Sequence, residues 1–316
     1  MHIPVLLNET VDGLLPTANA SYIDGTLGGA GHSRELLKRA GAGAKLLGLD
    51  RDPAAIERCS AALEEFGDNV RFVHTPFSLM GEVAPKAGFN QVDGIMLDLG
   101  VSSFQLDERE RGFSFMGDAP LDMRMDNSSG ITAAEYIDSF GEDWKSLASV
   151  LFDYGEEKQA AKIARAIIAA QHSSPIKTTL QLADLVEKAV GGRKGAPRHP
   201  ATKTFQAIRI AINSELQEVK KGIEAAISLL KPGGRLAVIS FHSIEDRVVK
   251  KTLAEHEGRW ESLQQGGSKW IGTLPAVKRV NKHPITASEE ELVNNPRARS
   301  AKLRIVERIE DFNNNL

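Results

Sequence analysis

The sequence predicts an α/β fold in which a parallel sheet is interrupted by a helical insert. In the first hundred residues, short apolar runs alternate with helical patterns, which is typical of βαβ units. Residues 105–205 are instead a succession of helical patterns, and a buried strand pattern returns at Leu236–Ile239. A chain of 316 residues has room for two domains. We expect one discontinuous domain, formed by residues 1–105 and 206–316, and a helical domain over residues 106–205.

Short apolar runs mark the expected strands of the first hundred residues. They are Tyr22-Ile23, Leu46–Leu49, Val70–Val73 and Ile95–Leu97. Asp52-Pro53, directly after the second run, offers an N-cap residue and a proline at the first helical position, so a helix is expected to begin there.

Helical patterns fill the middle of the chain. The expected helices are Ala133–Phe140, Lys158–Ala170, Leu180–Val190 and Asn213–Leu230. In the second of them Ile163 and Ile167 are four residues apart, so they share one face. Gly191-Gly192 closes the third helix, and Lys231–Gly234 is expected to stop the fourth.

Composition describes an ordinary folded chain and excludes several classes. Apolar residues make up 41% and charged residues 26%, which rules out a disordered or collagen-like polymer. The net charge of −3 does not predict a polyanion partner. Cys59 is the only cysteine, so an internal disulfide and a cysteine-rich zinc site are excluded. The chain has neither a secretory signal nor a run of about 18 apolar residues, and we expect a cytoplasmic protein with no membrane partner.

A glycine-rich loop, Asp24–Gly31, joins the first expected strand to a helix. Glycines let a ligand approach the backbone closely, although a turn that needs positive φ would explain them equally well. The dinucleotide fingerprint fails, because Arg34 stands where its third glycine belongs, and Gly31-His32-Ser33 lacks the lysine of a P-loop. These failures disfavour a nicotinamide oxidoreductase. A loop that opens with aspartate suits a cationic nucleoside better, and S-adenosylmethionine is such a ligand.

Acidic residues end two of the expected strands. Asp50 closes the second strand 22 residues after Gly28 (50 − 28), about where an acid binds ribose hydroxyls in nucleotide-binding folds. Asp98 ends the fourth strand, at the sheet edge where ligands bind, and a carboxylate that leaves a buried strand needs a partner or a purpose. Phe77 follows the third strand and either stacks on an adenine or is a core aromatic.

Longer motifs extend over nearly the whole chain. They are His2-x-Pro4-Val5-Leu6-Leu7-x-Glu9, Tyr22–Ser33, Leu49–Pro53, Leu97–Ser103, Arg111–Met116, Pro120–Asp126, His199–Ala207, Ser240–Ser243 and Asn295–Ser300. In these motifs the sequence resembles the RsmH (MraW) family. One departure is Phe104, which stands where the family often has proline.

The resemblance implies both a fold and an activity. The fold is a class I S-adenosylmethionine-dependent methyltransferase sheet, which is Rossmann-like, with an inserted all-helical domain. The family methylates N4 of a cytidine in the decoding region of 16S rRNA, so the implied partner is 16S rRNA within the small ribosomal subunit, and no metal is expected. The implied cofactor contacts are Ala30, Gly31, His32, Asp50, Phe77, Asp98 and Gln105.

The implied chemistry needs a group that assists a poor nucleophile. The lone pair of an exocyclic amine is delocalised into the base, so the enzyme must orient the amine and accept hydrogen bonds from it. Many amino-methyltransferases use Asp/Asn/Ser-Pro-Pro-aromatic for this, whereas this chain has Asp98-Leu99-Gly100-Val101. Asp98 and His242 are the candidate catalytic residues. For His242, a buried hydrogen-bonded histidine is an equal alternative.

Positive charge is concentrated locally despite the negative total. Residues 191–214 contain five Lys or Arg and no acid, and residues 262–288 contain four and no acid. Such stretches favour phosphate contacts, although a solvated surface is the commoner reason for charge clusters. The expected RNA-binding residues are Arg198, His199, Lys203, Arg209, Arg297 and Arg299.

Two other functions are alternatives to a methyltransferase. A non-enzymatic ribosome-assembly factor would bind RNA on the same scaffold but would not bind S-adenosylmethionine. The intact loop and the acids Asp24, Asp50 and Asp98 argue against it. A metalloenzyme is disfavoured because the eight histidines form no His-Glu-x-x-His pair.

Overall fold

The computed structural model describes residues 3–193, 195, 198–263 and 266–310. His2 of the first sequence motif and Lys194 of the basic stretch 191–214 therefore lie outside the described residues. The chain divides into unit 1, which is Met1–Gly100 with Leu216–Leu316, and unit 2, which is Val101–Glu215. These boundaries differ from the expected 105 and 205. The reason for the larger shift is the helix Thr202–Ile212, whose apolar residues lie in the core of unit 2.

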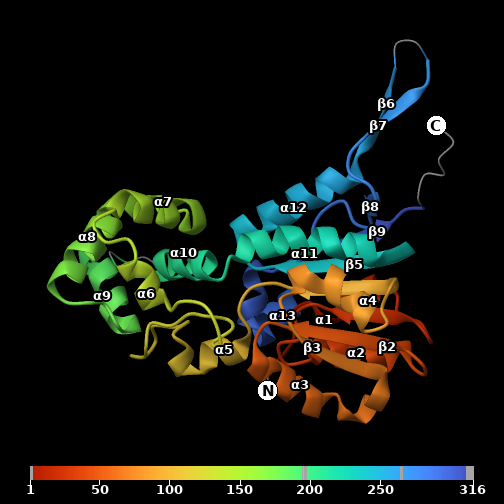
Figure 1. Cartoon of the computed structure of the whole chain (residues 1–316), viewed down its shortest axis with the longest axis horizontal. Helices are drawn as coiled ribbons and strands as arrows, with labels where there is room; N and C mark the ends of the chain where they lie inside the picture. The colour runs from red at the N-terminus through yellow and green to blue at the C-terminus, as the bar shows by residue number, and fades with distance from the viewer. Residues whose placement is uncertain (1–2, 194, 196–197, 264–265, 311–316) are drawn as a thin grey trace. The chain divides into compact units, whose positions relative to one another are not determined.

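Unit 1 is built on a sheet that is flanked by helices (Figure 1). The strand order of this sheet is β3-β2-β1-β4-β5-β9-β8. Its strands are β1 (Ser21–Asp24), β2 (Lys45–Asp50), β3 (Val70–His74), β4 (Val92–Asp98), β5 (Leu230–Ser240), β8 (Val277–Arg279) and β9 (Lys302–Arg308). β1 to β5 pair in parallel, and β9 runs antiparallel to β5 and β8. The parallel sheet that the sequence predicts is confirmed. The strand order reverses between β1 and β4, which is where open α/β sheets bind ligands.

Helices cover both faces of this sheet. α1 (Leu7–Gly13), α2 (Gly31–Ala40) and α3 (Pro53–Ala62) contribute to one core, and α4 (Met80–Lys86), α11 (Glu215–Leu229) and α12 (Ser243–Glu257) contribute to the other. Successive strand residues point to opposite faces, so Tyr22 lies in the first core and Ile23 in the second. Asp52 caps α3 by accepting a hydrogen bond from the Ala54 amide, as its sequence predicts.

The end of the chain contains elements that the sequence did not predict. They are the hairpin of β6 (Arg259–Ser262) and β7 (Ser268–Ile271), the strands β8 and β9, and α13 (Glu289–Asn294). The expected end of the fourth helix before Lys231 is confirmed, since α11 ends at Leu229. The strand that follows begins earlier than expected, because Lys231–Gly234 lie inside β5. The register with β4 shifts there between Val92 and Gly94, and Gly233 takes a φ of 81°. A bulge therefore accommodates the turn residues within the strand.

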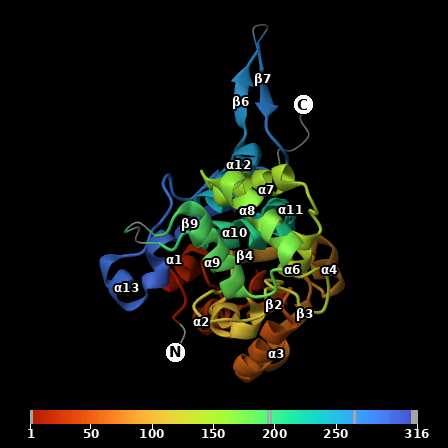
Figure 2. The ribbon, with the colours of Figure 1, turned by 90° about the vertical axis from the view of Figure 1, so that its left-hand side faces the viewer.

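Unit 2 is helical in its described residues (Figure 2). Its helices are α5 (Ser103–Asp107), α6 (Ala133–Asp138), α7 (Trp144–Gly155), α8 (Ala160–Ser173), α9 (Thr179–Val190) and α10 (Thr202–Ile212). The predicted apolar face of α8 is buried in one core with α7, α9 and α10. Gly191 ends α9 in the left-handed conformation. The sequence patterns did not predict α7 or α10. Short 3-10 segments are Glu64–Asn69, Phe77–Leu79, Arg109–Arg111 and Pro296–Ser300.

Across the described residues, no helix combines the length and the apolar character that a membrane span requires.

Candidate methyl-donor site

Three neighbouring strands of unit 1 each end on an aspartate. They are β2 at Asp50, β1 at Asp24 and β4 at Asp98. Because the strands are parallel, these carboxylates share one edge of the sheet, next to the point where the strand order reverses. The sequence predicted this grouping from the strand ends alone.

Asp24 ties the glycine loop to the helix that follows it. Its Oδ1 accepts a hydrogen bond from the Thr26 amide at 2.9 Å, and its Oδ2 accepts one from Ser33 Oγ in α2 at 2.6 Å. The Thr26 hydroxyl in turn accepts a hydrogen bond from the Asp98 amide at 2.6 Å. The loop is therefore fixed to the ends of two strands. Thr26 and Ser33 were not among the predicted site residues, although their positions in the loop motif could have indicated them.

Asp50 holds the tip of the same loop. Its Oδ2 accepts a hydrogen bond from the Gly28 amide at 3.0 Å, and its Oδ1 accepts one from the Asp52 amide at 2.9 Å. Next to this contact, Ala30 adopts a left-handed φ of 59° directly before α2. That conformation costs a non-glycine residue about 1 kcal/mol or more, and such strain clusters at ligand sites.

Burial raises the pKa of all three carboxyl groups. The pKa of Asp24 and the pKa of Asp50 each rise from 3.8 to about 6. The pKa of Asp98 rises to about 8, mainly through burial and further through the nearby Asp24 and Glu245. Asp98 Oδ1 is a buried oxygen for which the described residues provide no hydrogen-bond donor. A cationic ligand would relieve the mutual repulsion, so these residues fit a sulfonium nucleoside.

His32 joins the loop to Asp98. Its Nε2 lies 2.9 Å from the Val5 carbonyl oxygen, and its Nδ1 lies 3.9 Å from Asp98 Oδ2. Because a carbonyl only accepts hydrogen bonds, Nε2 must carry a hydrogen. The second ring nitrogen therefore faces the carboxylate that the sequence singled out.

His242 makes contacts within its own helix. Its Nδ1 accepts a hydrogen bond from the Glu245 amide at 3.3 Å and so caps α12, while its Nε2 lies 3.0 Å from Glu245 Oε1. Glu245 is buried and also accepts a hydrogen bond from the Phe241 amide. These contacts agree with the alternative of a structural histidine and leave its catalytic role a prediction.

Phe77 and Gln105 have well-defined local contacts. A Cβ at Gly222 of α11 would lie 2.2 Å from Phe77 Cδ2, so the ring packs against the backbone of that glycine, as a core aromatic does. Gln105 belongs to unit 2 and forms a capping box with Ser102 at the start of α5. Their cofactor contacts stay predictions.

The whole chain matches one family. The model of the MraW methylase family covers residues 1–309. This chain belongs to the MraW methylase family. The predicted family, the class I methyltransferase fold and the cofactor S-adenosylmethionine are thereby confirmed.

Named relatives span the same length. The chain is 46% identical over 309 residues to "Ribosomal RNA small subunit methyltransferase H" of Citrifermentans bemidjiense, covering 98% of both chains. A protein of the same name from Maridesulfovibrio salexigens is 48% identical over 313 residues, covering 98% of this chain and 95% of the relative. Among solved structures, an rRNA methylase from Streptococcus thermophilus aligns over 98% of this chain and 100% of that one, at 11% identity and a TM-score of 0.43.

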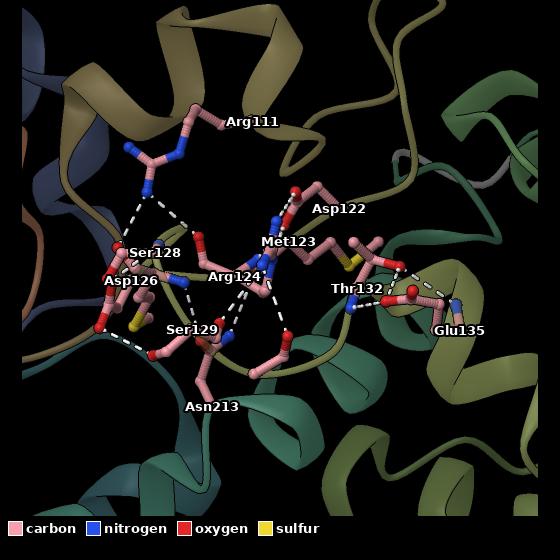
Figure 3. Close-up of polar contacts among 12 residues, drawn as sticks. Arg111, Asp122, Met123, Arg124, Asp126, Ser128, Ser129, Thr132, Glu135 and Asn213 are labelled. Atoms are coloured by element: carbon pink, nitrogen blue, oxygen red, sulfur yellow. Dashed lines mark hydrogen bonds and ion pairs between the residues drawn. The ribbon is translucent and has the colours of Figure 1, made fainter.

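In unit 2 of this MraW methylase, two sequence motifs build a polar frame around one loop (Figure 3). Arg111 is buried and donates hydrogen bonds to the carbonyl oxygens of Arg124 and Met125 at 3.1 and 2.8 Å. Asn213 donates to the Met123 carbonyl and accepts from the Met125 amide, both at 2.8 Å. These motifs therefore fix the path of the loop.

The predicted RNA-binding residues fall into two groups. Arg209 forms two hydrogen bonds with the buried carboxylate of Glu215, at 2.8 and 2.9 Å. His199 lies 2.9 Å from a Glu187 carboxylate oxygen and packs against the Phe115 ring. Both side chains are thus engaged inside unit 2. The remaining predicted residues, which are exposed, are Arg198, Lys203, Arg297 and Arg299. Of these, Lys203 also donates a hydrogen bond from Nζ to the Glu156 carbonyl oxygen at 2.8 Å.

Proposed function

We propose that this MraW methylase transfers a methyl group from S-adenosylmethionine to N4 of a cytidine in the decoding region of 16S rRNA. The names of its relatives, which are nearly half identical over the full chain, support the small ribosomal subunit as the source of the substrate. The observation that carries the chemistry is Asp98, with its buried, unpartnered oxygen at the sheet edge. We expect the activity in the cytoplasm, where ribosomal subunits are assembled.

Asp98 supplies what an exocyclic amine requires. An ionised carboxylate only accepts hydrogen bonds, and the amine offers two N–H groups. Accepting from one of them orients the nitrogen and favours its lone pair for bond formation. As the bond from nitrogen to the methyl group forms and the bond from sulfur to the methyl group breaks, Asp98 would take the proton that the nitrogen loses. The base must leave its stack to reach a carboxylate at a strand end, so an unpaired or flipped nucleotide is the expected substrate.

The loop residues hold the methyl donor. When bound, S-adenosylmethionine supplies an electrophilic methyl group on a positively charged sulfur. Asp50 would accept hydrogen bonds from the ribose hydroxyls, and the backbone of Ala30, Gly31 and His32 would contact the methionine part. Phe77 and Gln105 would neighbour the adenine or the rest of the pocket. Deprotonated Asp98 would stabilise the sulfonium charge as well as the acceptor amine.

Phosphate contacts would come from the exposed cations. Arg198, Lys203, Arg297 and Arg299 are the predicted RNA-binding residues that face solvent. His199 and Arg209 would then support RNA binding by keeping unit 2 folded.

Methyl transfer to undermethylated subunits tests this function. Small subunits from a strain without this protein are incubated with the enzyme and labelled S-adenosylmethionine, and the product nucleoside is identified. We expect the label on N4 of cytidine. Label on a cytosine carbon or on the ribose contradicts the acceptor, and normal turnover by Asp98→Asn contradicts the role of Asp98.

A further inference from the structure

The N-terminal segment Ile3–Leu6 packs on the start of α2, at the glycine loop. A Cβ at Gly31 would lie 2.3 Å from Pro4 Cγ, so the proline ring rests on the glycine backbone. The next residue, Val5, accepts the hydrogen bond from His32 Nε2 at 2.9 Å, and both residues are buried. The segment thus fixes two successive residues that are expected to contact the methyl donor.

Two residues almost 300 positions away hold this segment in place. Glu291 Oε1 accepts a hydrogen bond from the Leu6 amide at 2.8 Å. Asn295 Nδ2 donates one to the Ile3 carbonyl oxygen at 3.1 Å, and Asn295 is buried. Glu291 lies in α13 and Asn295 follows that helix, so one short element clamps both ends of the segment. Asn295 is also the first residue of the motif Asn295–Ser300. The sequence predicted a role in RNA binding for Arg297 and Arg299 of this motif, but no role for Asn295.

The hydrogen bonds of Glu291 and Asn295 with the segment Ile3–Leu6 also affect the tautomer of the His32 ring, through the Val5 carbonyl. The Val5 carbonyl requires hydrogen on Nε2, so in the neutral ring Nδ1 carries the lone pair. Nδ1 faces Asp98 Oδ2 at 3.9 Å. With the carbonyl displaced, the ring would lose the contact that selects this tautomer and this orientation toward Asp98.

We propose that Glu291 and Asn295 are positioning residues for the methyl-donor site. They hold the segment Ile3–Leu6, which seats Gly31 under Pro4 and orients His32 toward Asp98. The inference rests on the proposed function only for its catalytic consequence, because the contacts themselves join the C-terminal motif to the donor loop.

The experiment compares Asn295→Ala and Glu291→Ala with matched controls. Asn294→Ala and Glu290→Ala remove exposed side chains of the same helix. Among the described residues, the Asn294 amide donates within that helix, to the Glu290 carbonyl oxygen. Glu291→Gln keeps an oxygen that can accept from the Leu6 amide and is the rescue variant. S-adenosylhomocysteine is the probe, with its dissociation constant measured by calorimetry. The nitrogen signals of His32 are followed by NMR in histidine-labelled protein and assigned with His32→Asn.

We expect the two test variants to bind the probe about fivefold more weakly, the loss expected for one net hydrogen bond. The His32 signals should move from a single Nε2–H tautomer to a mixture. Both controls and Glu291→Gln should match the wild type. Wild-type affinity and wild-type His32 signals in both test variants would overturn the proposal.

Folding and function are separated by design. If Asn295→Ala does not fold, the test uses Glu291→Ala and the rescue variant Glu291→Gln. The Glu291 side chain is only partly buried, so its replacement is expected to leave the protein folded. No readout uses RNA. If the wild type does not bind S-adenosylhomocysteine, the proposed function fails, while the His32 signals still decide the positioning role.

Discussion

Asp98 differs from the other strand-end carboxylates in how its charge is controlled. Asp24 and Asp50 each accept two or more hydrogen bonds, which offset part of their burial. Burial, Asp24 and Glu245 all act in the same direction on Asp98 and raise its pKa to about 8. Near neutral pH the ligand-free protein therefore keeps a proton on Asp98 in much of the population, and a bound cation would favour its release.

The first prediction concerns stability against pH. A carboxyl group whose pKa is higher in the folded state stabilises the fold below its unfolded pKa of 3.8 and loses that contribution as pH rises to about 8. The melting temperature of the ligand-free protein should therefore fall between about pH 6 and pH 8 less steeply in Asp98→Asn than in the wild type. Differential scanning fluorimetry measures this, with the exposed Asp68→Asn as control. Identical slopes in all three proteins would contradict it.

The second prediction concerns the charge of the ligand. S-adenosylmethionine carries a sulfonium, whereas S-adenosylhomocysteine carries a neutral thioether. At pH 9, where Asp98 is ionised, Asp98→Asn should weaken S-adenosylmethionine about tenfold more than S-adenosylhomocysteine, since a charge-assisted contact contributes about 1.5 kcal/mol or more. Calorimetry with both ligands gives the ratio. An equal loss of affinity for both ligands would show that Asp98 does not interact with the sulfonium charge.

At the scale of elements, replacing Gly222 of α11 with alanine would have two opposing effects on stability: a gain in helix propensity and a clash with the Phe77 ring. Alanine usually stabilises a helix interior by about 1 kcal/mol relative to glycine. At Gly222 the new Cβ would lie 2.2 and 2.5 Å from two Phe77 ring atoms. Overpacking of this kind costs about 1–3 kcal/mol and exceeds the gain in helix propensity.

The third prediction follows from that comparison. Gly222→Ala should lower the free energy of unfolding of unit 1 by up to about 2 kcal/mol, which is the overpacking cost less the helix gain, and should displace the Phe77 ring. Gly81→Ala in α4 is the matched control, since its nearest neighbour would be Ala225 Cβ at an ordinary 3.6 Å. It should be neutral or stabilising by up to about 1 kcal/mol. Denaturant unfolding of both variants decides, and a stabilised Gly222→Ala would be the contrary result.

Elements with local signals were predictable from the sequence. Strand ends followed by aspartate, the cap at Asp52 and the Gly191 terminus depend on neighbours within a few residues, and the structure confirms them. The bulge at Lys231–Gly234 was missed because it depends on how β5 registers against β4. The antiparallel strands β8 and β9 likewise depend on pairing partners that no short pattern reveals.

In the candidate site, too, the sequence predicted the features that depend on local patterns and missed the contacts that depend on packing. Asp24, Asp50 and Asp98 followed from topology, whereas the contacts of Arg209 with Glu215 and of His199 with Glu187 follow from packing. The sequence alone does not show whether a basic side chain contacts an RNA phosphate or a carboxylate of the protein. The link from Glu291 to Leu6 spans 285 positions and left no sequence signal.

At the scale of the whole molecule, acids that are distant in sequence pair with several cations of the C-terminal part of the chain. Lys278 pairs with Glu307 at 2.8 Å, and Arg304 pairs with Asp246 at 2.8 Å. Arg279 pairs with Glu257. The net charge of −3 is therefore compatible with RNA binding only through the cations that stay exposed.

The fourth prediction is a salt dependence. Each alanine replacement of Arg198, Lys203, Arg297 or Arg299 that removes a phosphate contact should reduce the slope of log affinity against log salt by about 0.7–0.9. Lys278→Ala is the control, because Glu307 already pairs its charge. Fluorescence anisotropy with a 16S rRNA fragment, in roughly 50–200 mM salt, measures the slopes. Unchanged slopes in all four variants would remove these residues from the RNA surface.

The arrangement of unit 1 in two chain segments also governs how the protein is made. β4 ends at Asp98, but its partner β5 runs from Leu230 to Ser240, so translation must pass through all of unit 2 before the sheet can close. Until then a nascent chain carries a hydrophobic strand with an open edge, the kind of surface that aggregates or recruits chaperones. Unit 2 is continuous and can fold during this interval. We expect the insert to be the first part of the protein to resist proteases during synthesis.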